Sequence, residues 1–508
     1  MTDLVPQPVT ISTQPGSWTL SDATGIVADA AAEPAAQLLR ELVGPATGLA
    51  LPTVTGGSAG AITFRAEPTL ADEEYHLQVR PDGVQIAAAD IRGHRHAVQT
   101  LQQLLPAEVF SSDQVDGVKW EVPCVEIQDK PRFAWRGAML DVGRHFFPTE
   151  FLHRFVDLLA MHRLNKLHLH LTDDQGWRIE IEKYPRLTEV GAWRTESMAG
   201  HYKEQRFDGQ PHGGFYTKAE LRGLVEYAAA RGIDIVPEID LPGHMRAAIA
   251  AYPELGNHPE KTLPVATTWG VHPEVLNVED STIEFCKDVL TELMEVFPSP
   301  LIHIGGDECP KDEWNSSPAA QAKMAELGVD ADGLQSWFIG QLSSFLTEKG
   351  RRLIGWDEIL EGGLASGATV MSWRSEEGGI EAASAGHDVV MCPHLWTYFD
   401  YYQADPESEP VAIGRLTPLR TVYEYEPVPA ELGPEAAAHV LGTQGQLWTE
   451  YMPTSEHVEY MAFPRLCALA EVAWGTTGEY DDFRARLVAH LTRLDQQDVH
   501  YRRLDANT

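Results

Sequence analysis

Two adjacent carboxylates, Asp307 and Glu308, end the segment HIGGDE, which follows an apolar run. Cleavage of a glycosidic bond needs one group that protonates the departing oxygen and an electron pair that stabilises or traps the oxocarbenium-like carbon. In extended geometry, neighbouring side chains diverge, so this pair does not suit an acid and a nucleophile that face each other across a sugar. We therefore expect the two carboxylates to have different tasks. A solvated strand end or an ion pair is the alternative for such a pair taken alone.

Polar and aromatic residues also gather at the ends of other apolar runs. They comprise Asp141 to His145, Asp173 and Asp174, Glu238 to His244, Trp356 to Glu358, and Trp448 to Glu450. In a barrel of parallel strands, the carboxyl ends of the strands share one face, and active sites are built on that face. We expect the polar, glycine-rich stretch 191–216 to form a loop near it.

The elements that would position these residues begin at about residue 131, where strand-like runs start to alternate with amphipathic helices. Eight strand candidates follow in order: WRGAMLDV, NKLHLHLT, IDIVPEI, LIHIGG, RLIGWDE, TVMSW, DVVMCP and HVLGTQGQLW. Helices are expected from Thr149, Lys218 and Ser281, over 333–349, and from near Ser455. The pattern predicts a (β/α)8 barrel over residues 131–508, completed by the C-terminal helices. The rival is a doubly wound open sheet, but no GxGxxG follows a strand and no P-loop sequence occurs.

Residues 1–130 predict a separate, small α/β unit in front of the barrel. Short β-like runs such as GAITFRA and EYHLQVR precede a helical stretch, HRHAVQTLQQLL, which Gly93 introduces. The predicted fold class is therefore α/β, a TIM barrel preceded by a small α/β domain.

Composition limits the possible partners. The chain has 39 basic and 75 acidic residues, and a formal net charge of −36 opposes docking onto nucleic acid or anionic lipid. The sequence has neither a signal-peptide pattern at its start nor an apolar run of the roughly 20 residues that a membrane span needs. We expect no nucleic acid or membrane partner and a cytoplasmic location, although secretion of a processed form is also compatible.

The five cysteines are odd in number and widely spaced, which favours reduced, packed thiols over a disulfide framework or a CxxC metal site. Alternate histidines, His168 and His170, could share one strand face and hold a metal. No HExxH or cysteine cluster supports that interpretation, so filling of the barrel interior is favoured. We therefore expect neither a metal nor a cofactor.

Six motifs occur in order across about residues 130–475: LDVGRHFFP (140–148), HLHLTDDQGWR (168–178), PEIDLPGH (237–244), HIGGDE (303–308), GWDE (355–358) and QLWTE (446–450). Together they resemble the family 20 glycoside hydrolases, the β-N-acetylhexosaminidases, and SW at 372–373 falls where that family has it. The N-terminal unit is similar to the small α/β domain that precedes the barrel in this family.

The resemblance implies exo-acting, retaining hydrolysis of terminal β-linked N-acetylglucosamine or N-acetylgalactosamine. In the family, the substrate's 2-acetamido oxygen attacks the anomeric carbon and forms an oxazolinium-like intermediate, an exception to the two-carboxylate scheme. Glu308 matches the general acid and base, which would need a raised pKa that burial could supply. Asp307 matches the residue that orients the acetamide and stabilises its positive charge. Tyr398 matches the hydroxyl that hydrogen-bonds the acetamide carbonyl.

The other matched residues would surround the sugar or support the acid. Trp356, Trp373 and Trp448 match aromatic walls, Arg144 and Glu450 match partners of the non-reducing-end hydroxyls, Asp400 matches a contact to the 6-hydroxyl, and Asp173 and His244 match a pair behind the acid. Residues that enclose the non-reducing end of the sugar, as Arg144 and Glu450 would, make an enzyme exo-acting.

Several alternatives stay open. A disaccharide-releasing member of the family, a specialist for 6-sulfated sugars and a non-catalytic sugar-binding barrel would all keep these motifs. A chitinase-like endo-hydrolase is disfavoured because its DxxDxDxE signature is absent. Since loops at barrel rims often mediate dimers, a homodimer is also possible.

Overall fold

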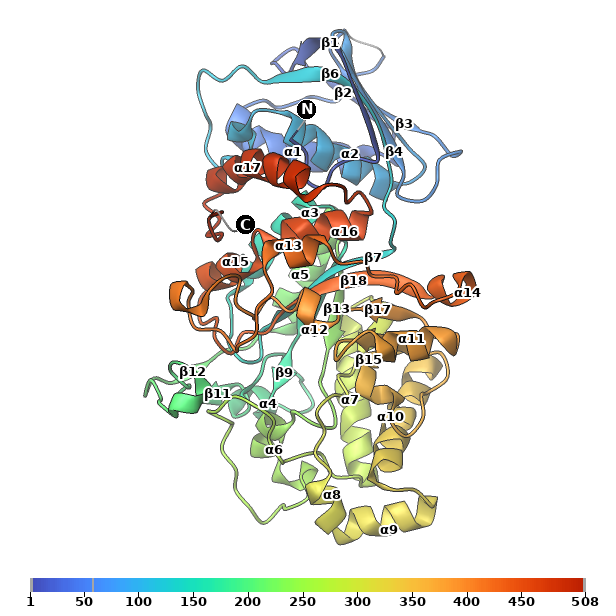
Figure 1. The fold of residues 1–508 in the computed structure, drawn as a ribbon, viewed down its shortest axis with the longest axis vertical. Helices are drawn as coiled ribbons and strands as arrows, with labels where there is room; N and C mark the ends of the chain where they lie inside the picture. Colours follow the sequence, from blue (N-terminus) through green and yellow to red (C-terminus); the bar gives the residue numbers. More distant parts are fainter. Residues whose placement is uncertain (1–2, 57–58, 506–508) are drawn as a thin grey trace.

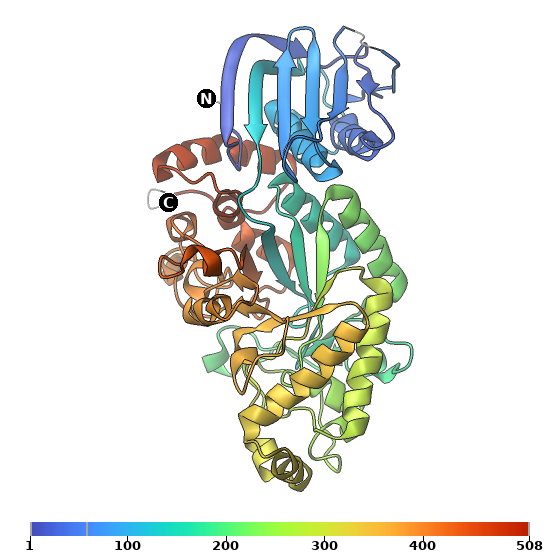
Figure 2. The ribbon, with the colours of Figure 1, turned by 90° about the vertical axis from the view of Figure 1, so that its right-hand side faces the viewer.

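A computed structural model describes residues 3–56 and 59–505 (Figure 1). Its N-terminal unit is a six-stranded sheet of order β1-β6-β4-β5-β3-β2. The strands are β1 (Thr10–Thr19), β2 (Ile26–Val27), β3 (Ile62–Ala66), β4 (Tyr75–Arg80), β5 (Gly83–Ala88) and β6 (Glu121–Asp129). Helices α1 (Glu33–Thr47) and α2 (Ile91–Leu104) cover one face of the sheet (Figures 1 and 2). The alternation in β4, which buries Tyr75, Leu77 and Val79, matches a sheet with one covered face.

Helix α2 begins before the predicted position. Asp90 is its N-cap, and the Asp90 carboxylate accepts a hydrogen bond from the backbone N–H of Gly93 at 2.9 Å. Gly93 therefore lies inside the first turn of the helix. Glycine is required there because a Cβ would lie 2.4 Å from the carbonyl oxygen of Glu74.

The second unit is a closed barrel of eight parallel strands in the order β13-β14-β15-β16-β17-β18-β7-β8. The strands are β7 (Trp135–Asp141), β8 (Lys166–His170), β13 (Asp234–Glu238), β14 (Leu301–His303), β15 (Arg352–Trp356), β16 (Thr369–Ser372), β17 (Val389–Met391) and β18 (Val440–Leu447). The predicted (β/α)8 barrel is confirmed, and each of the eight predicted runs contains one of these strands. Strands that are buried on both faces have near-continuous apolar sequences, and β7 is buried along its whole length.

Helices and short strands connect the barrel strands, and the last three helices follow the final strand. The helices are α3 (Thr149–Met161), α4 (Arg186–Glu189), α5 (Lys218–Arg231), α6 (Arg246–Ala251), α7 (Asp280–Val296), α8 (Asp312–Ser316), α9 (Pro318–Leu327), α10 (Ala331–Glu348), α11 (Glu377–Ser384), α12 (His394–Thr397), α13 (Leu419–Tyr423), α14 (Pro434–Ala437), α15 (Ser455–Ala462), α16 (Arg465–Trp474) and α17 (Tyr480–Gln496). The short strands are β9 (Thr172–Asp173), β10 (Gly176–Trp177), β11 (Trp193–Arg194) and β12 (His212–Gly213). A capping box between Thr217 and Glu220 starts α5, and Gly232 with φ of 82° ends it.

The C-terminal helices α16 and α17 pack against different parts of the protein. Helix α16 packs against β18 and β7 of the barrel, as predicted. Helix α17 instead lies between the barrel and the N-terminal unit, which Figures 1 and 2 both show. From α17, Arg493 donates a 2.8 Å hydrogen bond to the carbonyl of Gln103, and Arg486 donates one of 2.7 Å to the carbonyl of Leu4. Helix α17 also contacts the barrel unit, because His490 lies 2.9 Å from His162 at the end of α3, so α17 joins the two units.

None of the helices in the described part of the chain has the length and apolar character needed to cross a membrane. All five cysteines are free and buried, as the sequence predicts.

Candidate active site

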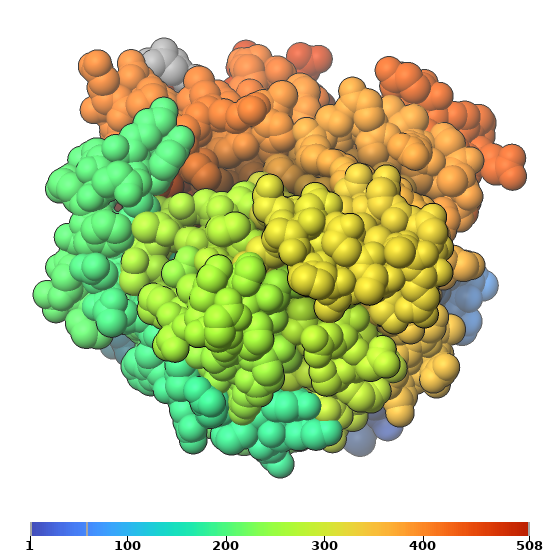
Figure 3. Space-filling model, turned by 90° about the horizontal axis from the view of Figure 1, so that it is seen from below, coloured from blue at the N-terminus to red at the C-terminus, as the bar shows by residue number. Residues whose placement is uncertain are grey.

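A cavity of about 430 Å³ lies at the carboxyl ends of the barrel strands. Its lining comprises Arg144, Tyr202, Trp269, Gly270, Val271, Asp307, Glu308, Trp373, Tyr398, Asp400, Tyr401, Ile413, Trp448, Glu450 and Tyr451. Eight of the eleven predicted site residues are among them, and Asp173, His244 and Trp356 are not. Figure 3 shows yellow-green and orange segments that border each other on the surface seen from below.

The register of the barrel strands builds a buried polar layer below the cavity. Asp141 pairs with His170, His170 with Glu238, and Glu238 with His303 across neighbouring strands. All four side chains are fully buried. Glu238 accepts hydrogen bonds from His170 at 2.6 Å and from the indole of Trp356 at 3.0 Å. Trp356 is therefore held in this layer and lies beneath the cavity lining instead of in it.

The two predicted catalytic carboxylates follow a sharply bent segment after β14. Gly305 and Gly306 have φ of 65° and 93°, and a Cβ on Gly305 would lie 1.7 Å from the Asp240 carboxylate. Glu308 itself has φ of 41°, a strained value for a residue with a side chain. Because the backbone is not extended, the Asp307 and Glu308 side chains do not diverge as expected and instead reach the same cavity.

His244 lies behind both carboxylates. Its Nε2 is 3.4 Å from Glu308 Oε2 and 3.9 Å from Asp307 Oδ2. Its Nδ1 is 3.3 Å from Asp173 and 3.1 Å from Asp174. Although burial opposes the charged form, the charge of Asp173 and the hydrogen bonds to the carboxylates raise the pKa of His244 well above its ordinary value. His244 thus lies in direct contact with the predicted acid, and Asp173 lies behind His244.

The pKa values of the two carboxylates shift in opposite directions. Burial and the charge of Glu308 raise the pKa of Asp307 to about 6, although His244 opposes this shift. Burial also pushes the pKa of Glu308 upward, but the hydrogen bond and charge of His244, with the charge of Arg144, hold it below its ordinary value. The expectation that burial raises the pKa of Glu308 is therefore wrong for this structure, in which the Glu308 side chain is 40% exposed and faces a cationic imidazole.

A second group of polar residues comes from the segments after β7 and β18 and from the connection between β17 and β18. Arg144 pairs with Asp173 at 2.9 Å and with Asp141 at 3.5 Å, and its guanidinium lies 5.0 Å from the Trp448 ring centre. Burial raises the pKa of both Asp400 and Glu450. The Asp400 Oδ1 atom is buried and has no hydrogen-bond partner among the described residues. This group can therefore supply a fixed cation and free acceptors to hydroxyl groups of a ligand.

Aromatic side chains also line the cavity. The Trp373 and Tyr398 rings are stacked at 5.9 Å with an angle of 20° between their planes, and Trp448 lies 6.4 Å from Tyr398. Burial raises the pKa of the Tyr398 hydroxyl well above its ordinary value, so Tyr398 keeps its proton and can donate a hydrogen bond to a ligand in the cavity that it lines.

Sequence reasoning missed several residues of this site. Asp174 shares His244 with Asp173, although only Asp173 was predicted to do so. The cavity rim includes Tyr202, Val271 and Ile413, which lie in long connections without a motif. The sequence did indicate the position of Tyr202, because the polar stretch 191–216 was predicted to form a loop near this face of the barrel.

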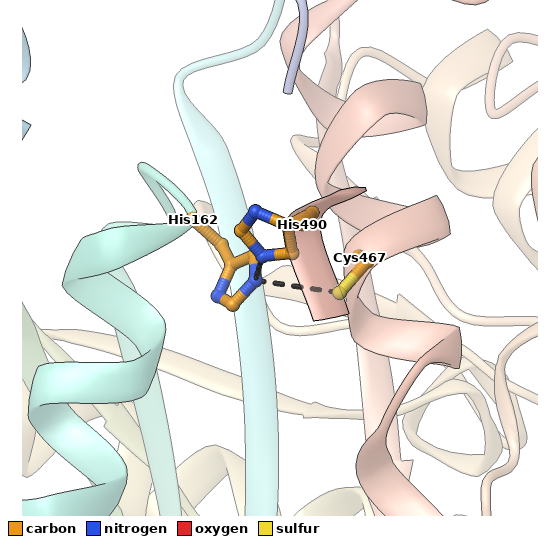
Figure 4. Close-up of side chains that lie close together, drawn as sticks. All are labelled: His162, Cys467 and His490. Carbon is orange, nitrogen blue, oxygen red and sulfur yellow. Dashed lines mark hydrogen bonds between the residues drawn. The ribbon is translucent and has the colours of Figure 1, made fainter. Parts of the chain in front are cut away.

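Buried histidine, cysteine and carboxylate groups also approach one another at spacings that a metal ion could use. One such group, His162, Cys467 and His490, lies outside the active site (Figure 4). The Nδ1 of His162 donates to the carbonyl of Leu158 at 2.6 Å, and Arg493 donates to the Nδ1 of His490 at 3.3 Å. His490 Nε2 must then donate to His162 Nε2, 2.9 Å away. Hydrogen bonds between neutral side chains therefore account for this cluster.

A (β/α)8 barrel with paired carboxylates, aromatic walls and a buried arginine at its strand ends is the architecture of a glycoside hydrolase. Residues 133–477 match the family described as glycosyl hydrolase family 20, catalytic domain, and residues 1–130 match domain 2 of the same family. The chain belongs to glycosyl hydrolase family 20.

Relatives of known name share most of the chain. A beta-hexosaminidase from Porphyromonas gingivalis is 45% identical over 509 residues, which cover 98% of this chain and 64% of that protein. The chain thus spans just under two thirds of that relative's length. A beta-N-acetylhexosaminidase from Cellulomonas fimi is 34% identical, with 97% of this chain and 94% of that protein covered.

Solved structures agree with this assignment. The exo beta-N-acetylglucosaminidase from Vibrio harveyi, in complex with N-acetylglucosamine, superposes with a TM-score of 0.88 at 37% identity and covers 99% of this chain and 78% of its own. The beta-N-acetylhexosaminidase from Streptomyces coelicolor gives a TM-score of 0.86 at 33% identity and covers 99% and 98%.

Proposed function

We propose that this protein is an exo-acting β-N-acetylhexosaminidase that cleaves terminal β-linked N-acetylglucosamine or N-acetylgalactosamine with help from the substrate's acetamide. One observation carries the proposal. The buried Asp307 Oδ1 has no hydrogen-bond partner among the described residues, and it lies beside Glu308, which is open to the same cavity. A buried carboxylate oxygen without a partner is costly, and an acetamide N–H is a donor of the right kind.

In the first step, the acetamide carbonyl oxygen attacks the anomeric carbon while the bond to the aglycone oxygen breaks. Glu308 gives its proton to that departing oxygen. Asp307, as a carboxylate, accepts the acetamide N–H and stabilises the positive charge that develops on the acetamide. The O–H of Tyr398 donates to the acetamide oxygen and holds it in position for attack.

The proton that Glu308 donates can be held jointly with His244. In the free site, the charged imidazolium and the Glu308 carboxylate face each other at 3.4 Å. A sugar that covers Glu308 excludes water, and exclusion of water favours the neutral pair, in which the proton lies on Glu308. Asp173 and Asp174 then act on the acid through His244.

In the second step, Glu308 removes a proton from a water molecule that attacks the anomeric carbon. The bond between that carbon and the acetamide oxygen breaks, and the acetamide is restored. Two displacements at one carbon retain the β configuration. The group of Arg144, Asp400 and Glu450 supports an exo mode, because it offers hydroxyl partners to a terminal sugar.

The first experiment compares an aryl β-N-acetylglucosaminide with the matching aryl β-glucoside, using the purified chain and its Glu308→Gln variant. Release from the acetamido sugar alone, lost in the variant, supports the proposed activity and its dependence on the acetamide. Comparable release from both sugars would refute acetamide participation. Release from neither, with retained binding of the sugar, would favour a non-catalytic sugar-binding barrel; release of a disaccharide from longer substrates would favour the disaccharide-releasing alternative.

Other proposals concern preference and assembly. We infer that both the gluco and galacto configurations are accepted, which parallel assays of the two aryl glycosides would test. A homodimer and a cytoplasmic location are also proposals, which sedimentation and cell fractionation would test.

A further inference from the structure

A second cavity, of about 340 Å³, adjoins the active site and shares Val271 and Glu308 with it. Glu358 lines this second cavity, although its side chain is only 10% exposed. The proposed mechanism gives Glu358 no task. Its environment nevertheless ties it to one wall of the sugar site.

Glu358 and its neighbour Asp357 hold Trp373 from two sides. Glu358 Oε2 accepts a hydrogen bond from the indole Nε1 of Trp373 at 2.9 Å. Asp357 Oδ2 accepts one from the Trp373 backbone N–H at 3.2 Å, and Asp357 Oδ1 accepts one from Arg374 Nε at 2.7 Å. The backbone of Trp373 is thus fixed by Asp357, while the rotation of its ring is fixed by Glu358.

We propose that Glu358 is a positioning residue that sets the width of the acetamide pocket by fixing the Trp373 ring through the indole N–H. This inference rests on the proposed function, because the wall matters only if an N-acyl group lies against it. Trp373 is stacked on Tyr398, so a change in the ring angle alters the space beside the Tyr398 hydroxyl. A fixed wall favours an acetyl group over a longer acyl group, and a loosened wall tolerates both.

The ionisation of Glu358 agrees with a structural acceptor. Burial and the charges of Asp307 and Asp357 raise the pKa of Glu358 to about 9. At neutral pH a protonated Glu358 accepts the indole hydrogen bond without a further negative charge beside Asp307. Glutamine, which is neutral and nearly the same shape, should therefore replace it.

The test measures selectivity for the acyl group. The ratio of kcat/KM for aryl N-acetyl and N-propionyl β-glucosaminides would be compared among the wild type, Glu358→Ala and Glu358→Gln. Glu361→Ala is the matched control, because Glu361 lies on the same turn, lines the same second cavity and pairs with Arg374 but makes no hydrogen bond to Trp373. Thermal melting of all four proteins identifies any general loss of folding.

The ratio should fall about tenfold in Glu358→Ala, which corresponds to one lost hydrogen bond, and should be retained in Glu358→Gln and in Glu361→Ala. An unchanged ratio in Glu358→Ala, or an equal fall in Glu361→Ala, would overturn the inference. The proposed function fails separately, because its failure would leave the wild type itself without activity on the N-acetyl substrate.

Discussion

Replacement of Asp307 by asparagine should abolish most activity and at the same time stabilise the folded protein. The pKa of Asp307 is raised from its ordinary 3.8 to about 6, mainly by burial. The folded state therefore binds the proton more tightly than the unfolded state, and its stability decreases as the pH rises. This free-energy cost to the folded state develops between about pH 4 and pH 6. It is complete above that range, where it reaches about 3 kcal/mol at most. Asparagine carries no charge and removes this cost.

The same change removes the carboxylate that stabilises the acetamide charge. Loss of one preorganised group at a developing charge lowers kcat by about 10² to 10³. Thermal melting at about pH 8 would be measured beside kcat/KM on an aryl N-acetylglucosaminide. At this pH, the melting temperature of Asp307→Asn should be some degrees higher than that of the wild type. The difference should shrink towards about pH 4.

Glu308→Gln is the matched control for this prediction. The pKa of Glu308 is lowered by His244, so the folded state favours the charged form and removal of the charge should not stabilise the protein. A lower melting temperature for Asp307→Asn at neutral pH, or the same gain in Glu308→Gln, would refute the reasoning from burial.

Further predictions concern the acid, the pH profile, Asp400 and metals. Glu308→Gln should lose more activity on poor leaving groups than on good ones, and equal losses would contradict its role as acid. The wild-type kcat/KM should fall as the pH drops below about 6, because Asp307 becomes protonated, and a flat profile down to about pH 4 would contradict this. Asp400→Ala should cost about tenfold in kcat/KM on the normal substrate but little on its 6-deoxy analogue, and equal costs would remove Asp400 from the 6-hydroxyl. Dialysis against a chelator should leave activity and melting unchanged, because hydrogen bonds already satisfy His162 and His490; recovery by added zinc would contradict this.

The barrel was predictable because its strands are short apolar runs with polar ends. The run LIHIGG, for example, combines a buried strand with a glycine turn that places Asp307 and Glu308 at the strand end. The ordered motifs and the further matches that the family resemblance implies identified eight residues that line the cavity. They gave no geometry: the positive φ of Glu308 and the close approach of Gly305 to Asp240 are features of the tertiary structure that no motif describes.

Other features depend on contacts between distant segments. Helix α17 has an amphipathic sequence that suits either a barrel or another unit, and its arginines join it to the N-terminal unit through backbone carbonyls far away in sequence. The lowered pKa of Glu308 depends on His244, which approaches it from the segment after β13. The rim residues Val271 and Ile413 lie in long connections, where neither periodicity nor a motif indicates their position.

Participation of the substrate's acetamide is the central claim, and its nucleophilicity can be varied directly. The measurement is kcat/KM for a series of aryl β-glucosaminides in which the N-acetyl group carries zero, one, two or three fluorine atoms. Fluorine atoms on the methyl group withdraw electrons from the carbonyl oxygen and change the size of the acyl group little. A steady, steep fall in kcat/KM across the series is predicted. A rate that does not depend on the number of fluorine atoms would contradict the account, because the acetamide oxygen would then take no part in bond formation.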